Sequence, residues 1–249
     1  MRRMFTRAAV GLALALLCAC AKPEPKPDRA PVVQSKHRMV NPLVDSEDDG
    51  DGMKVEGTLG TLEQSAIQAG LNPALLEVTT CFNGEQKQKP YLGGKATLQF
   101  RVARDGTVKK LELKSSTLGS MVVNRCILDA ARTARFARPR GGEAEFDYSV
   151  ELSGQILPVV WDPGMVRDEI EKNREKLTTI RVGRRSTSLV VPAGLVITMH
   201  LNRRGRVVSV GMVAVEEIDE EFASHLVSAL KAIKFERPNS SYAKVTFSW

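Results

Sequence analysis

Apolar and polar residues alternate in two stretches of the chain that lie 99 positions apart. Every second residue in each stretch is apolar, which is typical of a strand with one buried face. The apolar residues are Ala96, Leu98, Phe100 and Val102 in the first stretch and Leu195, Ile197, Met199 and Leu201 in the second. A turn containing Gly106 or Gly205 follows, and then a second strand whose apolar phase shifts at the same place in both stretches. This shared shift predicts a shared β-bulge.

A helix and a third strand complete each stretch. Ser120 and Asp219 occupy equivalent positions and are suited to cap a helix N-terminus. An apolar stripe with helical spacing follows each of them. Both stripes end at a Phe-x-Arg-Pro sequence, at residues 136–139 and 235–238, where proline prevents a further helical turn. Each repeat also has a helix upstream, in which the offset aligns Ile180 with Cys81.

The sequence therefore predicts an α+β protein with two tandem αββαβ domains. A repeat of about 100 residues is too long for a solenoid and fits a duplicated small domain. In each domain the first and second strands form a hairpin, and the helix after them brings the third strand back beside the first. The predicted order across the sheet is therefore second strand, first strand, third strand. The predicted parts are a signal peptide at 1–19, a Pro-rich and acidic stalk at 20–60, a first domain at 61–153, an apolar connector at 154–164 and a diverged second domain at 165–249.

Further sequence motifs in the first domain indicate a family. Gly-Thr-Val at 106–108, Ser-Ser-Thr-Leu at 115–118, Arg-Cys at 125–126 and Gly-Gly at 141–142 accompany Phe-Ala-Arg-Pro at 136–139. With these motifs the domain resembles the C-terminal domain of the AgmX/PglI type, known from gliding-motility proteins and related to the C-terminal domains of TonB and TolA. The resemblance implies a three-stranded antiparallel sheet with helices on one face, and a role in protein interaction. The second domain keeps fewer motifs, so its membership depends on the repeat.

The N-terminus has the pattern of a lipoprotein signal peptide. Three arginines precede a short apolar run and the sequence Leu-Cys-Ala-Cys, which resembles a lipobox and predicts lipidation of Cys20. Cys18 is the alternative site. A transmembrane helix is the rival interpretation, but the run of about ten residues is shorter than the roughly 20 that a span needs. Ala21 follows Cys20, where aspartate would favour the inner membrane, so we expect a periplasm-facing protein of the outer membrane.

The stalk has the composition of an extended, disordered tether. Its acidic stretch at residues 45–56 imitates a calcium-binding loop, although Gly52 stands where such loops are apolar. The alternatives are a calcium site and a solvated linker. Within the connector, by contrast, the run at 156–161 is too apolar for a flexible linker and is predicted to pack across the domain junction. A basic stretch with Arg181, Arg184 and Arg185 predicts a solvated loop.

The remaining cysteines form a pair. Once the signal peptide is removed and Cys20 is lipidated, only Cys81 and Cys126 are left. In an oxidising compartment they predict a disulfide between two helices, and the alternative is two buried free thiols. The second domain has Ile180 and His225 at these positions, so both members of the pair are lost together.

Catalytic and metal-binding patterns do not emerge from the sequence. The histidines are His37 in the stalk, His200 on the outward face of a strand and His225 at the boundary of a helix. They belong to no Ser-His-Asp, HExxH or CxxC arrangement, and no glycine-rich phosphate loop is present. Without the three arginines of the signal peptide the net charge is +4, which gives no reason to expect nucleic acid. We therefore expect no enzyme, cofactor, metal or small-molecule substrate.

The predicted function is that of a lipid-anchored envelope scaffold or adaptor that binds other envelope proteins in a motility or transport assembly. A small-ligand or peptidoglycan-binding sensor is the alternative, which a large polar pocket between the domains would favour. The predicted partner site is the edge of the third strand of the first domain, since Lys109, Lys110 and Lys114 guard the opposite edge. The rival is that the two domains pair through these edges. The edge-strand residues are Ala144, Phe146, Tyr148 and Val150.

The lipid anchor gives a first testable prediction. Replacing Cys20 by serine removes the thiol that accepts the lipid, so Cys20→Ser should yield an unprocessed or soluble periplasmic protein. Mass spectrometry of the wild-type N-terminal peptide checks this, with Cys18→Ser as the matched control. A wild-type peptide without acyl mass on Cys20 would contradict the prediction.

Overall fold

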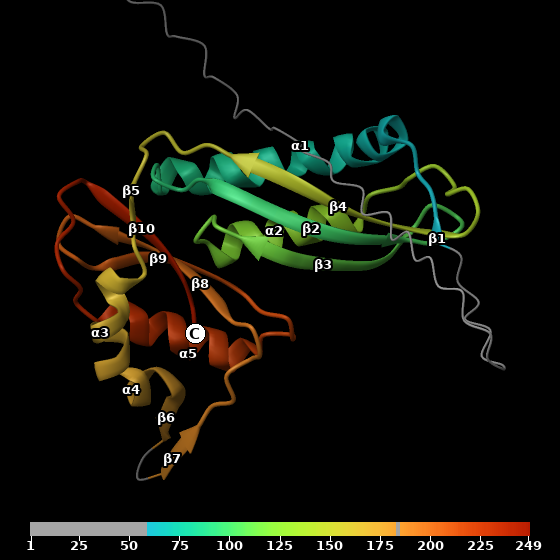
Figure 1. The fold of residues 1–249 in the computed structure, drawn as a ribbon. Coiled ribbons are helices and arrows are strands. Elements are labelled where there is room, and N and C mark those ends of the chain that lie inside the picture. Colours follow the sequence, from blue (N-terminus) through green and yellow to red (C-terminus); the bar gives the residue numbers. More distant parts are fainter. Residues whose placement is uncertain (1–58, 183–184) are drawn as a thin grey trace, which may run out of the picture. The chain divides into compact units, whose positions relative to one another are not determined.

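Helices and strands are described for residues 59–182 and 185–249 in a computed structural model (Figure 1). These residues have a mixed α+β fold and belong to one compact unit, Pro31–Trp249. The predictions for the signal peptide, Cys20 and the acidic stretch at 45–56 concern residues outside this description. The first half contains β1 (Leu59–Gly60), α1 (Gln64–Gln88), β2 (Gly94–Val102), β3 (Val108–Ser116), α2 (Met121–Arg132) and β4 (Glu143–Leu152). The second half contains β5 (Val159–Trp161), α3 (Gly164–Lys172), α4 (Arg174–Thr178), β6 (Thr179–Val182), β7 (Arg185–Ser188), β8 (Val196–Asn202), β9 (Val207–Val213), α5 (Glu220–Ala232) and β10 (Tyr242–Ser248).

Each half contains a four-stranded sheet, and the two sheets have the same strand order. The order is β1-β4-β2-β3 in the first half and β5-β10-β8-β9 in the second. Three strands of each sheet are antiparallel, and their predicted order is confirmed. The predicted number of three strands is wrong, because β1 and β5 each add a short parallel strand at one edge. These segments run extended along the edge, where strand pairing satisfies backbone groups.

The predicted β-bulge is present in both sheets. The register between β2 and β3 shifts between Arg101 and Val102. The register between β8 and β9 shifts between His200 and Leu201, which are the equivalent residues 99 positions later. The shared shift of apolar phase thus corresponds to a shared feature of the backbone.

The turn before each second strand packs against the Phe-x-Arg-Pro sequence. The backbone N–H of Phe136 donates to the Gly106 carbonyl at 2.9 Å, and Phe235 donates to Gly205 at the same distance. Gly106 has a φ of 88° and Gly205 a φ of 72°, a region that favours glycine. A Cβ on either residue would also lie within 2.2 Å of a carbonyl oxygen. Both glycines are therefore required by the turn and by its close contact.

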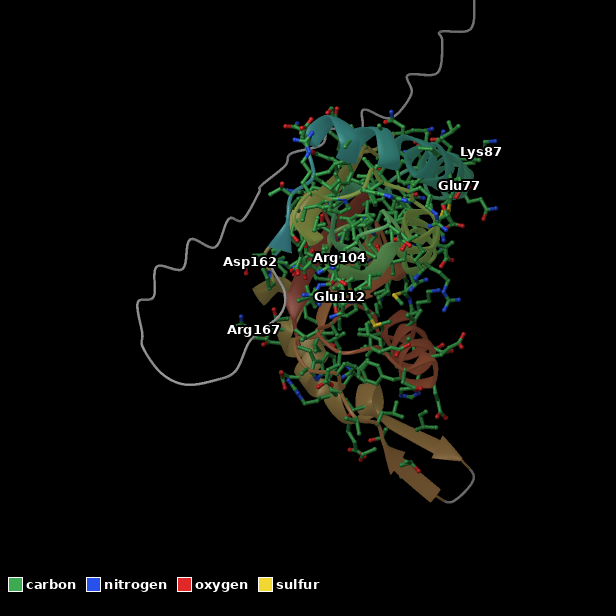
Figure 2. The ribbon with its side chains drawn as sticks, turned by 90° about the vertical axis from the view of Figure 1, so that its right-hand side faces the viewer. Glu77, Lys87, Arg104, Glu112, Asp162 and Arg167 are labelled. Atoms are coloured by element: carbon green, nitrogen blue, oxygen red, sulfur yellow. A yellow bond between two sulfur atoms is a disulfide. The ribbon has the colours of Figure 1, made fainter. Side chains whose placement is uncertain are left out.

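Helix caps and an apolar core position the helices. The Ser120 hydroxyl accepts from the Val123 N–H at 3.4 Å, and the Asp219 carboxylate accepts from Phe222 at 3.0 Å, which confirms both predicted caps. The core of the first half includes a cluster of three rings whose centroids lie 5.1–5.7 Å apart. The cluster consists of Phe100, Phe136 and Phe146. Charged side chains such as Glu77 and Lys87 extend from the exposed surface of α1 (Figure 2).

The second half begins differently from the first. Where the first half has the long helix α1, the second has two short helices, α3 and α4, followed by the hairpin of β6 and β7. The prediction that places Ile180 in a helix is wrong, since Ile180 lies in β6. The run of β-branched residues Thr178, Thr179 and Ile180 favours a strand. Arg181 and Arg185 likewise lie in the hairpin and not in the predicted loop.

The apolar connector does not pack across a junction as predicted. Its last residues form β5, which pairs with β10, and Trp161 is buried in the core of the second half. Leu157 and Val160 are 83% and 73% exposed. The Ile156 N–H donates to the Pro90 carbonyl at 2.9 Å and so links the start of this run to the first half. Sheet pairing, and not burial of the whole run, therefore explains its apolar β-branched residues.

A disulfide between Cys81 and Cys126 joins α1 to α2, with the two Cα atoms 6.5 Å apart. In the second half the residue equivalent to Cys126 is His225, whose Nε2 lies 2.9 Å from the Lys176 carbonyl of α4. The two halves therefore connect the corresponding pairs of helices by different interactions, a covalent bond and a hydrogen bond.

The disulfide gives the second prediction. Because it closes a loop of 45 residues, replacing both cysteines by alanine should lower the free energy of unfolding by about 4 kcal/mol in the chain-entropy model. Denaturant melts of the wild type and the double variant measure the difference. In the unfolded, unreduced wild type both thiols should resist maleimide labelling, and complete labelling of both would contradict the bond.

Candidate functional site

The outer edge of β4, the predicted partner site, is open along most of its length. β1 pairs only with Glu143 and Ala144. Among the residues described, no strand pairs with this edge over residues 145–152. The rival prediction, in which the edges of the two halves pair with each other, is wrong, because β4 and β10 belong to separate sheets.

The four side chains predicted at this edge face the core. Ala144, Phe146, Tyr148 and Val150 are each at most 8% exposed, and Phe146 stacks on Phe100. A partner strand would therefore meet the backbone of β4 and the side chains of its outward face. The four residues position the strand and do not themselves present a binding surface.

The outward face of the first sheet is covered by ion pairs. Lys109 of β3 reaches Glu143 of β4 at 2.5 Å, and Lys114 reaches Asp147 at 3.1 Å. The Lys109 ammonium group, through its hydrogen bond, holds the pKa of Glu143 below its usual value. These lysines thus neutralise the carboxylates of β4 in addition to placing charge on the β3 edge. Exposed pairs of this kind contribute little to stability.

The outward face of the second sheet is buried by the first half. Thr198 of β8 is 1% exposed and Ser209 of β9 is 5% exposed. Their hydroxyl groups donate to backbone carbonyls of the first half, Thr198 to Ser116 at 3.3 Å and Ser209 to Gly119 at 2.6 Å. The end of β3 and its connection to α2 therefore supply acceptors for a polar sheet face that would otherwise be solvated.

His200 lies at the centre of this contact and is completely buried. As predicted, His200 lies in a strand and on its outward face. That face is not exposed to solvent, however, because the first half covers it. Its ring centroid is 5.1 Å from that of Tyr91, and neither ring nitrogen has a hydrogen-bond partner among the residues described. Burial, with the charge of Lys244, lowers the pKa of His200 from 6.5 to about 3, and the Gly119 backbone opposes this shift only in part.

Two further titratable groups line the same contact. Lys244 pairs with His200 across β10 and β8, and burial lowers its pKa. Its ammonium group lies 3.4 Å from the Gly93 carbonyl of the first half. Tyr91 packs on Tyr242 with ring centroids 4.3 Å apart, and burial raises the pKa of Tyr91. The contact therefore favours the neutral forms of three groups that ionise in water.

Sequence reasoning missed this contact, although one signal is present. Gly211 lies in the middle of β9, where glycine often marks the close approach of another backbone. A Cβ on Gly211 would come within 2.7 Å of the Ser120 nitrogen. Gly119 has a φ of 65°, and a Cβ there would lie 2.6 Å from the ring of His200. Only the tertiary structure, however, identifies the surface that approaches.

The hollows elsewhere on the described surface include two that are lined by helices. One is a groove of about 720 Å³ between α2 and α5. The other is a cavity of about 410 Å³ between α3 and the end of β10, where Arg174 lies over the Trp249 ring at 5.2 Å. Arg167, which also lines this cavity, is labelled in Figure 2.

Comparison with protein-family models, with curated proteins and with solved structures gave no match. The resemblance to AgmX/PglI-type domains accordingly stays a prediction. Within residues 59–182 and 185–249, no helix is both long and apolar enough to cross a membrane. The same residues contain no cluster of three metal-ligating side chains.

The buried histidine gives the third prediction. The pKa of His200 is lower in the folded protein than in the unfolded chain. The free energy of unfolding therefore has its full value above about pH 6.5, and it decreases as the pH falls toward 3, because only the unfolded chain takes up a proton at this ring in that range. The free energy of unfolding should fall by about 2 kcal/mol between pH 7.5 and pH 5 from this residue alone. Urea melts across this range measure the slope.

His200→Gln should remove this part of the slope, whereas the matched control His225→Gln should keep it. An unchanged slope in His200→Gln would show that the ring does not resist protonation in the folded protein.

Proposed function

We propose that the chain is a lipid-anchored scaffold or adaptor of the cell envelope that binds other envelope proteins. Cys20 would carry the lipid, and the stalk would hold the folded part away from the membrane surface. The prediction from Ala21 assigns this surface to the periplasmic face of the outer membrane. A disulfide between Cys81 and Cys126 supports an oxidising compartment such as the periplasm.

We further propose that the two halves are tandem domains related to the C-terminal domains of TonB and TolA. The shared strand order, the equivalent bulges and the equivalent helix caps support a duplication. A lipid anchor cannot transmit work from a motor in the membrane in the way a transmembrane helix can. The proposed role is therefore that of a passive scaffold in a motility or transport assembly.

The observation that carries the proposal is the one-sided pairing of β4 over residues 145–152. An extended peptide can add to such an edge by backbone hydrogen bonds, and side chains on the outward face can select its sequence. Glu145 and Glu151 of that face are exposed, and Glu145 also lies 3.8 Å from the Arg101 guanidinium group. Their charge would favour a partner strand with basic residues at alternate positions.

A small-ligand or peptidoglycan-binding sensor is the second candidate, and the cavity beside α3 supports it. Arg167 and Arg174 contribute cationic groups to a wall that also contains Val166, Ile170 and Glu171, and Glu171 pairs with Arg174 at 2.8 Å. The cation of Arg167 beside the apolar side chains would suit a small anionic ligand with an apolar part. This candidate differs from the scaffold in one respect that can be measured: changes at the β4 edge would leave ligand binding unaffected.

Proline substitution at β4 gives the fourth prediction. Asp147→Pro and Ser149→Pro each remove a backbone N–H and disturb the edge, so binding of an envelope partner should weaken by about tenfold or more. The partner is first identified by affinity purification of the full chain from detergent-solubilised envelopes. Its affinity for each variant is then measured with purified proteins.

Glu112→Pro, on the β3 edge of the same sheet, is the matched control and should bind normally. Circular dichroism and thermal melts establish that all three variants are folded. Partner binding that survives both changes in β4 would rule out strand addition at this edge.

A further inference from the structure

The groove between α2 and α5 has two helical walls and a mainly apolar floor. Both helices pack against β9, and the groove between them has a volume of about 720 Å³. It extends along α2 from Met121 to Arg132, which is about 16 Å at 1.5 Å per residue. This length matches three turns of a helix. Its apolar lining consists of Met121, Val122, Leu128, Ala223 and Val227.

One polar group on the floor of the groove lacks a partner. Asn124 is 3% exposed, and its Oδ1 accepts from the Ser116 hydroxyl at 2.7 Å. Its Nδ2 has no hydrogen-bond partner in the described part of the chain. A buried donor without an acceptor is unfavourable, so this residue marks a polar point beneath an otherwise mainly apolar floor.

The two walls of the groove differ in charge. Arg125 on α2 is exposed and forms no ion pair among the described residues, whereas Arg132 is paired with Asp129 at 2.8 Å. The α5 wall carries Glu220, which is also exposed and without an ion pair in this part of the chain. An occupant with a carboxylate on one flank and a cation on the other would complement both walls.

The walls also determine the backbone form of the occupant. Helix sides offer no row of free N–H and C=O groups, so an extended peptide would leave its own backbone groups unpaired on the apolar floor. A helix satisfies these groups internally and can place an apolar stripe into such a groove. If the same groove of a second copy of this chain faced this one, two concave surfaces would meet, and neither groove would be filled.

We propose that the groove between α2 and α5 binds an amphipathic helix of a partner protein, with a carboxylate facing Arg125 and a lysine or arginine facing Glu220. The apolar stripe of the partner helix covers Val122, which is 53% exposed. This site is separate from the β4 edge and goes beyond the proposed function, so either can fail without the other.

A defined peptide tests the proposal. The probe is a labelled 18-residue helix with leucines on one face, glutamates on one flank and lysines on the other, and its control is a peptide of scrambled order. Fluorescence anisotropy with the full chain in detergent should show binding of the helix and at least about tenfold weaker binding of the scrambled peptide.

Two variants of the groove act on different parts of it. Val122→Asp places a charge in the apolar stripe, and Ser224→Trp fills the groove from the α5 wall without altering a core residue. Each should weaken binding by about tenfold or more. Leu76→Asp, on α1 and 71% exposed, is the matched control and should bind normally. Circular dichroism confirms the fold of every variant.

A charge exchange tests the orientation. Arg125→Glu should weaken binding of the probe, and a probe with lysines in place of its glutamates should restore it, whereas Arg138→Glu should change neither affinity. The proposal is overturned if the helix and the scrambled peptide bind equally, if neither binds, or if Val122→Asp and Ser224→Trp have no effect. It is also overturned if sedimentation shows a dimer that Val122→Asp abolishes, since a second copy would then occupy the groove.

Discussion

Burial of the polar face of the second sheet is the contact on which the arrangement of the two halves depends. The hydroxyl groups of Thr198 and Ser209 lose water there, but carbonyl groups at the end of β3 and in its connection to α2 replace it. The ring nitrogens of His200 are not compensated among the described residues, and each such group costs about 1–3 kcal/mol. Packing of the ring against Tyr91 offsets part of this cost. The groove between α2 and α5 exists because this contact holds both helices on β9.

Much of each half could be predicted because its signals are local. Alternation of apolar residues depends only on the pleat of a strand, and the bulge between Arg101 and Val102 changes that alternation directly. Caps such as Ser120 and Asp219 act on N–H groups three residues away, so their effect is also local. The internal repeat made these signals stronger, since each was read twice.

The remainder depends on surfaces that meet only after folding. β1 and β5 are too short to give a pattern, and they form strands because an open edge lies beside them. The burial of His200 requires a second surface that the sequence of β8 does not specify. The candidate edge was predicted as a strand, but which of its side chains face the core is decided by the tertiary structure, as buried Phe146 illustrates.

The pairing of β1 with β4 has a mechanical consequence for a tethered protein. The chain enters the described structure at Leu59, which pairs with Glu143 at one end of the strand that presents the open edge. If the proposed partner binds β4 and the proposed tether holds the N-terminus, tension between them would pass through neighbouring strands of one sheet and would bypass the second half. The load would act along strands β1 and β4, which pair at two positions, Leu59 with Glu143 and Gly60 with Ala144. The second half could then change its conformation without breaking the connection under tension.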